Sequence, residues 1–208
     1  MRIETLKTNA RPGGKLRVVF SDGSTLAVLP SVAAEFSLYA GSEIDDVQLA
    51  ALKRRASEMA AKDRAVRIIS TTGVTKRDLE RRLVQKGESA DDAKAAVEWL
   101  SELSLLDDAE VARQTVARGV AKGYGKSRIR QMLYEKQVPK QYWDEALAQM
   151  PDMDGALDDF LQKKLRGSVD RDDVQKAAQA AARRGHSWSD IKKALARYSE
   201  QVALEEDV

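Results

Sequence analysis

The chain has 208 residues, of which 43% are hydrophobic and 5% aromatic, and its 35 Lys and Arg side chains nearly balance 33 Asp and Glu. Such a composition, with only 4 prolines, favours helices over a β-sandwich or barrel. The lack of cysteine and the single histidine, His186, exclude disulfides, thiolate chemistry and a histidine-rich metal site or histidine-based triad within one chain. Much of the known chemistry of enzymes is thereby excluded.

The sequence carries no sign of a membrane or export segment. No run approaches the roughly 18 to 20 apolar residues of a membrane span. The start, MRIETLKTNARPGGK, lacks the apolar core of a secretory signal. We expect a cytoplasmic protein without a membrane partner.

The first 63 residues combine strand and helix signals. Residues 15–29 form two runs rich in β-branched residues around Asp22-Gly23, a pair typical of a tight hairpin turn. Pro30 is predicted to end the second strand, and residues 38–44 are predicted to form a loop. Residues 45–62 show apolar positions at helical spacing, which predicts a helix. Residues 1–63 are thus predicted to be an N-terminal extension made of a β-hairpin and a helix.

From residue 64 the strand signals end and an internal repeat begins. Leu79 and Leu83 lie 50 positions before Ile129 and Leu133. An offset of 98 places Gly87 on Gly185, although alanines at 177 and 181 replace the larger residues of the first copy. The third copy is weaker but in register.

Each copy divides into three short helical segments. In the first copy these are 64–70, 75–85 and 90–103; Thr75 and Ser89 are suited to cap helices, and Gly87 to end one. Helices this short need neighbours to bury their apolar faces. We predict a mainly α fold of three tandem three-helix, helix-turn-helix-like repeats (64–106, 107–151 and 152–200), followed by an acidic tail (201–208).

Basic residues concentrate in the second repeat. Residues 111–140 hold eight cationic side chains against the single acid Glu135, and residues 64–86 hold seven against two. Such segregation on a nearly neutral chain can attract a phosphate backbone or an acidic protein surface. A solvated helix face is the plainer alternative, because Lys and Arg are also good helix formers.

The peptide Gly123-Tyr-Gly-Lys-Ser127 is similar to the end of a phosphate-binding loop. The motif needs glycine at position 120, where the chain has Val120, and no strand precedes it. We interpret the segment as a helix joint. Tyr124 within it could pack between repeats or touch a partner.

Other candidate residues have structural interpretations. The acids Asp107, Asp108 and Glu110 fit the first turn of a helix better than a cation site. His186 is expected to be a cap or surface residue, and Trp143 a core residue, with stacking on nucleic-acid bases as the alternative.

The central repeat resembles the bacterial RecX family, the regulators of the RecA recombinase. The matching residues run from Leu105 to Asp108, from Val111 to Arg113 and from Lys122 to Arg130, with Lys136 and Val138. Segments 76–87 and 183–195 resemble the first and third repeats of the family. The N-terminal hairpin resembles, more loosely, the N-terminal extension of the longer family members. The chain departs from the family pattern at Gln137, where the family usually has glycine at the end of a helix. It departs again at the alanines from 177 to 182, which replace bulkier residues in a helix of the third repeat.

The resemblance implies a negative regulator of RecA in DNA repair, homologous recombination and the SOS response, which is not an enzyme and needs no cofactor. Such a protein binds the groove of the RecA–DNA filament and inhibits ATP hydrolysis, strand exchange and coprotease activity. We expect a monomer that also binds single- and double-stranded DNA weakly. A stand-alone DNA-binding helix-turn-helix-like protein, with Gln131 and Gln85 as faint base-reading candidates, is the alternative. The candidate partner-binding residues are Arg81, Arg82, Lys86, Lys122, Tyr124, Lys126, Arg128, Arg130 and Lys136.

Overall fold

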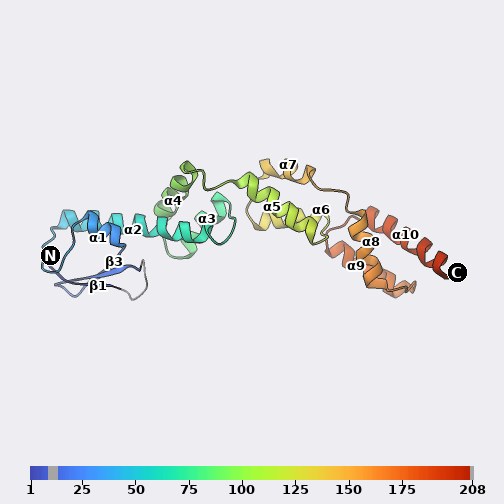
Figure 1. The fold of residues 1–208 in the computed structure, drawn as a ribbon, viewed down its shortest axis with the longest axis horizontal. Helices are drawn as coiled ribbons and strands as arrows, with labels where there is room; N and C mark the ends of the chain where they lie inside the picture. Colours follow the sequence, from blue (N-terminus) through green and yellow to red (C-terminus); the bar gives the residue numbers. More distant parts are fainter. Residues whose placement is uncertain (9–13, 207–208) are drawn as a thin grey trace. The chain divides into compact units, whose positions relative to one another are not determined.

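The computed structural model describes residues 1–8 and 14–206 (Figure 1). The chain forms two compact units, Met1–Leu106 and Asp107–Val208. Within the described residues the fold is mainly helical, with a small N-terminal sheet, as the sequence predicts.

The N-terminal sheet has three antiparallel strands in the order β1 (Ile3–Thr8), β2 (Leu16–Phe20) and β3 (Thr25–Val28). The predicted hairpin is confirmed as β2 and β3. Gly23 supplies the positive φ of its turn, at +82°. Strand β1 was not predicted, because four of its six residues are polar or charged. Its fully buried Ile3 nevertheless joins the sheet to the first core.

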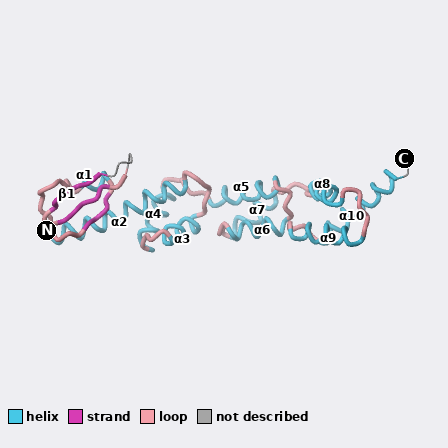
Figure 2. Tube along the Cα trace, turned by 90° about the horizontal axis from the view of Figure 1, so that it is seen from below, coloured by secondary structure: helices cyan, strands magenta, loops and turns pink. Residues whose placement is uncertain are grey.

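A long helix links this sheet to the first three-helix unit. After α1 (Pro30–Glu35), helix α2 runs from Asp46 to Ile69 and begins with a capping box between Asp45 and Gln48. The sheet, drawn in magenta in Figure 2, lies beside α1 and the first half of α2. Its buried side chains belong to the same hydrophobic core as Leu52 of α2. The expected separation between helices 45–62 and 64–70 is wrong: no glycine or proline interrupts this stretch, and α2 continues through it.

The end of α2 packs against α3 (Lys76–Gln85) and α4 (Ala90–Glu102). Their shared core contains Ala61, Ala65, Leu79, Leu83 and Leu100. The predicted caps are confirmed, since the Thr75 hydroxyl accepts from the Asp78 amide and the Ser89 hydroxyl from the Asp92 amide. Three helical segments therefore bury one another's apolar faces, as short helices require.

The second unit contains two further three-helix groups. The first comprises α5 (Asp108–Ala121), α6 (Lys126–Glu135), and the short 3-10 segment η1 (Lys140–Tyr142) that leads into α7 (Trp143–Ala148). The second comprises α8 (Asp154–Leu165), α9 (Arg171–Arg183) and α10 (Trp188–Glu206). The predicted acidic tail thus continues α10 as far as residue 206, and residues 207–208 lie outside the described part.

Two departures from the family pattern are accommodated locally. Gln137 adopts the left-handed conformation, with φ at +55°, and the amide of Val138 still reaches the Leu133 carbonyl at 3.0 Å. The helix end forms without the usual glycine. In the last group, Ala177 and Ala181 are fully buried against leucines of α8 and Ile191, so the small side chains are matched by larger ones from the neighbouring helices.

Trp143 is half-buried against the core of the second group, and its indole nitrogen donates to the Val138 carbonyl at 2.9 Å. This confirms its packing role. No described helix has the length and apolar character required to cross a membrane.

Candidate partner-binding surfaces

A joint between two glycine-containing turns positions the basic helix α6. The turn from α5 to α6 meets the turn from α9 to α10 through direct backbone hydrogen bonds. The Gly125 amide donates to the Arg184 carbonyl at 2.9 Å, and the Ser127 amide donates to the Gly185 carbonyl at 3.2 Å. These amides are therefore engaged within the protein, which confirms a helix joint in place of a phosphate loop.

Only glycine allows the two backbones to approach this closely. A Cβ on Gly125 would lie 2.2 Å from the Gly185 carbonyl oxygen, and a Cβ on Gly185 would lie 2.3 Å from the Arg128 amide nitrogen. Gly185 also has a φ of +89°, which side-chain-bearing residues rarely adopt. The joint thus couples the start of α6 to the third three-helix group.

His186 lies inside this joint and is only 7% exposed, so the expectation of a surface or capping residue is wrong. Its Nε2 is 3.1 Å from the Gly123 carbonyl oxygen. Because a carbonyl can only accept, Nε2 carries the proton in this contact. Burial lowers the pKa of His186, and the hydrogen bond to Gly123 opposes this only in part.

The lowered pKa of His186 predicts a pH-dependent stability. The unfolded chain binds a proton near the ordinary histidine pKa, whereas the folded chain binds it only at lower pH. The free energy of unfolding should therefore fall as the pH drops below about 6.5, by at most ~1.4 kcal/mol per pH unit for this one proton. Between pH 8 and pH 5, the free energy of urea unfolding should decrease less for His186→Gln than for the wild type. An equal decrease in the two proteins would show that the pKa of His186 is not lowered by folding.

Tyr124 packs within the joint. The guanidinium of Arg184 contacts two aromatic rings, 5.1 Å from the centroid of Tyr124 and 4.8 Å from that of Phe160. One of its nitrogens also donates to the Lys122 carbonyl. Of the two roles considered for Tyr124, packing between repeats is therefore observed, although the half-buried ring still lines a surface groove.

The predicted cations around α6 fall into two groups. Lys122, Lys126 and Arg130 are exposed, and none has a carboxylate within 4.0 Å in the described part of the chain. Arg128 is half-buried beside Gly185 and approaches Glu135 at 3.4 Å. Lys136, at the end of α6, is half-buried as well. The accessible positive charge of this surface therefore comes from the first group.

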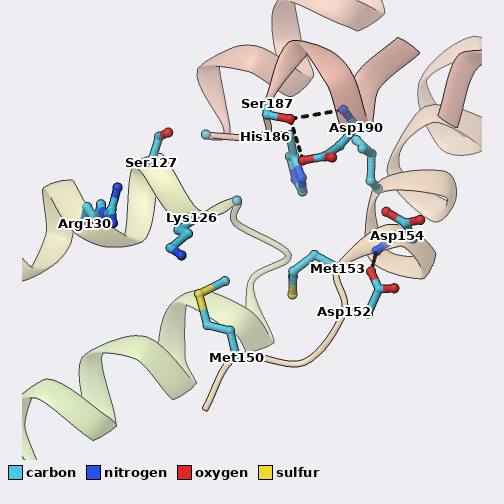
Figure 3. A pocket seen from close by; sticks show the side chains of 13 residues that line it. Lys126, Ser127, Arg130, Met150, Asp152, Met153, Asp154, His186, Ser187 and Asp190 are labelled. Atoms are coloured by element: carbon cyan, nitrogen blue, oxygen red, sulfur yellow. Dashed lines mark hydrogen bonds between the residues drawn. The ribbon is translucent and has the colours of Figure 1, made fainter. Parts of the chain in front are cut away.

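A pocket lies where α6 and α10 begin. Figure 3 shows Lys126 and Arg130 on one side, with His186 and Asp190 opposite, and Asp152 and Asp154 nearby. The Ser187 hydroxyl accepts from the Asp190 amide, which caps α10. With two cations and three carboxylates in its lining, the pocket has no single sign of charge.

The candidate residues of the first unit are held differently. Arg81 and Arg82 both contact the carboxylate of Asp78, at 2.5 and 2.9 Å, and Asp78 is 1% exposed. Lys86, at the end of α3, is exposed and has no ion pair among the described residues. The structure therefore places Arg81 and Arg82 as a pair fixed by a buried acid, and Lys86 as a separate charge.

The acids at the start of α5 serve the helix. The Asp107 side chain accepts from the Glu110 amide at 2.9 Å, and Glu110 contacts Arg113. The described residues contain no cluster of His, Asp or Glu suited to a metal ion. Sequence reasoning missed Phe160 and the groove beside it, because no motif or charge run marks a residue brought to the joint by tertiary packing.

Comparisons with known proteins agree on one family. A family model described as "RecX, second three-helix domain" matches residues 107–147. The regulatory protein RecX of Vibrio parahaemolyticus is 32% identical over 146 residues, which cover 69% of this chain and 94% of the relative. The regulatory protein RecX of Clostridioides difficile is 24% identical over 200 residues, which cover 93% of each protein.

Solved structures show the same fold. A crystal structure of regulatory protein RecX superposes with a TM-score of 0.63 at 23% identity, covering 92% of this chain and 97% of the other. The structure of RecX from Lactobacillus salivarius gives a TM-score of 0.60 at 19% identity and covers 71% of this chain and 97% of the other.

Proposed function

Because this chain belongs to the RecX family of regulatory proteins, which inhibit the RecA recombinase, we propose that it binds along the groove of the RecA–DNA filament. Bound there, it suppresses ATP hydrolysis, strand exchange and coprotease activity without catalysing a reaction itself. It acts in the cytoplasm as a monomer, with RecA as its main partner and single- and double-stranded DNA as weaker ones. Tandem three-helix units suit this role, because several modest contacts reinforce one another along a repeating partner.

The observation that carries this proposal is the exposed basic face of α6. Lys126 and Arg130 are exposed one helical turn apart and have no carboxylate partner among the described residues. The joint holds α6 by its first turn, so these cations are presented by a rigid element. Asp152, Asp154 and Asp190 line the pocket beside these two cations but pair with neither, so both cations can still contact an acidic protein surface or DNA phosphates.

The stand-alone DNA-binding alternative rests on one observation. Gln131 is exposed next to Arg130 on the second helix of a three-helix group, the place from which helix-turn-helix proteins read bases. Tight, sequence-selective duplex binding without any effect on RecA would favour it.

Reversing the charge of the α6 face tests the proposal. We expect Lys126→Glu combined with Arg130→Glu to raise the concentration needed to inhibit RecA ATP hydrolysis on single-stranded DNA by about tenfold or more. Arg128 is left intact because it packs at the joint.

The matched control is Lys192→Glu with Lys193→Glu, an exposed pair on α10. It makes the same change in net charge elsewhere and should leave inhibition within about twofold of the wild type. Equal effects of the two double variants would reject a specific α6 contact. A wild-type protein that does not inhibit RecA would reject the proposed function itself.

A further inference from the structure

A groove lies beside the joint, between α6, α8 and α9. Its lining brings together cations and aromatic rings from these three helices and the turn before α6, namely Arg128, Lys164, Arg183, Arg184, Tyr124 and Phe160. Within residues 1–8 and 14–206, no carboxylate belongs to the lining. The groove therefore differs from the pocket in Figure 3, where acids outnumber cations.

The positive charge of the groove is largely unneutralised. Lys164 and Arg183 are exposed, and neither has an ion pair in the described part of the chain. Arg184 contacts two rings and a carbonyl, and no carboxylate comes within 4.0 Å of it among the described residues. Of the four cations, only Arg128 has a carboxylate within 4.0 Å among the residues that the structure describes, that of Glu135 at 3.4 Å.

Helix dipoles explain part of this arrangement. Lys164 lies in the last turn of α8 and Arg183 in the last turn of α9, where cations are favourable. Dipole compensation accounts for the position of each cation along its own helix. It does not account for their convergence beside two half-buried aromatic rings.

We propose that this groove binds single-stranded nucleic acid. Lys164, Arg183 and Arg128 contact successive phosphates, and unpaired bases pack beside Tyr124 and Phe160. A basic groove combined with aromatic rings is the usual arrangement for binding single strands. The half-buried rings of Tyr124 and Phe160, which also hold Arg184, line this groove and can pack against bases, whereas an acidic peptide needs only the cations. The inference rests on the part of the proposed function that names single-stranded DNA as a weaker partner, and it assigns that partner a site. Because the test below contains no RecA, its failure would leave inhibition of RecA untouched.

Fluorescence anisotropy with a labelled 20-nucleotide oligo(dT) and no RecA tests the groove. We expect Lys164→Ala with Arg183→Ala to weaken binding by about tenfold at low salt. The slope of log affinity against log salt should become shallower by roughly 0.7 for each phosphate that the variant no longer neutralises. The matched control, Lys192→Ala with Lys193→Ala, removes the same charge from exposed sites on α10 and should stay within about twofold of the wild type.

A third variant separates stacking from charge. Tyr124→Leu should lose roughly fivefold or more in affinity with an unchanged salt slope, while hydrogen-exchange protection of the Ser127 amide shows that the joint persists. The groove assignment would be overturned if the groove double variant and the α10 control double variant lost the same affinity for oligo(dT), or if neither lost any. Displacement of oligo(dT) by poly-glutamate at equal charge concentration would identify an acidic-peptide site and overturn it too. A duplex that binds more tightly than oligo(dT), with the same dependence on Lys164 and Arg183, would also overturn it.

Discussion

Replacing Gly125 with alanine is expected to destabilise the second unit by about 3 kcal/mol, the upper end of the usual cost of overpacking. The added Cβ would meet a backbone carbonyl at 2.2 Å, and a backbone cannot move aside as a flexible side chain can. The hydrogen bonds from Gly125 and Ser127 to the facing turn would break together. Urea unfolding and peptide-resolved hydrogen exchange across residues 123–128 and 184–187 would measure the effect.

Gly155→Ala provides the control for this substitution. A Cβ at Gly155 meets no atom of the described residues within 4 Å, and the glycine lies in the first turn of α8. Because alanine loses less backbone entropy than glycine in a helix, this variant should be unchanged or more stable by up to ~1 kcal/mol. If Gly125→Ala behaved like Gly155→Ala, the close approach of the two turns would not exist in solution.

Replacing Asp78 with alanine should cost the first unit about 2 kcal/mol. Asp78 lies in the first turn of α3, where its buried carboxylate contacts Arg81 and Arg82 and its backbone amide donates to the capping hydroxyl of Thr75. Removing one partner of a fully buried ion pair costs more than this, but both arginines are partly exposed and water can solvate them. Urea unfolding, with hydrogen exchange in α3 and α4, would measure the loss.

Asp63→Ala is the matched control for Asp78→Ala. Asp63 pairs with Arg67 one turn along α2, where the arginine side chain is 67% exposed. Such surface pairs contribute little, so the change should stay below about 0.5 kcal/mol. Similar losses for the two variants would show that burial of Asp78 adds nothing. In that case Arg81 and Arg82 would be ordinary surface charges, more available to a partner than the structure indicates.

The local structure of this protein could be predicted where short-range physics decides it. Thr75 and Ser89 cap helices because a hydroxyl placed before a helix satisfies its first amides. Gly87 ends α3 at a φ of +93°, as its place in the repeat indicates. Strand β1 and the continuity of α2 could not be predicted in this way, because a polar edge strand and an uninterrupted run of helix formers carry no distinctive local signal.

In the candidate site too, some features follow from the local sequence and others only from tertiary packing. The sequence alone determined that α6 and its surroundings are basic and that Gly123 to Ser127 form a joint, because charge and glycine content are local properties. The tertiary structure alone decided which cations remain accessible. Asp78 engages Arg81 and Arg82, and packing against Gly185 encloses Arg128, while Lys126 and Arg130 stay exposed. It also decided the burial of His186 against Gly123 and the meeting of Arg184 with Tyr124 and Phe160. These last contacts join residues 24 to 63 positions apart, and only the packing of helices brings such residues together.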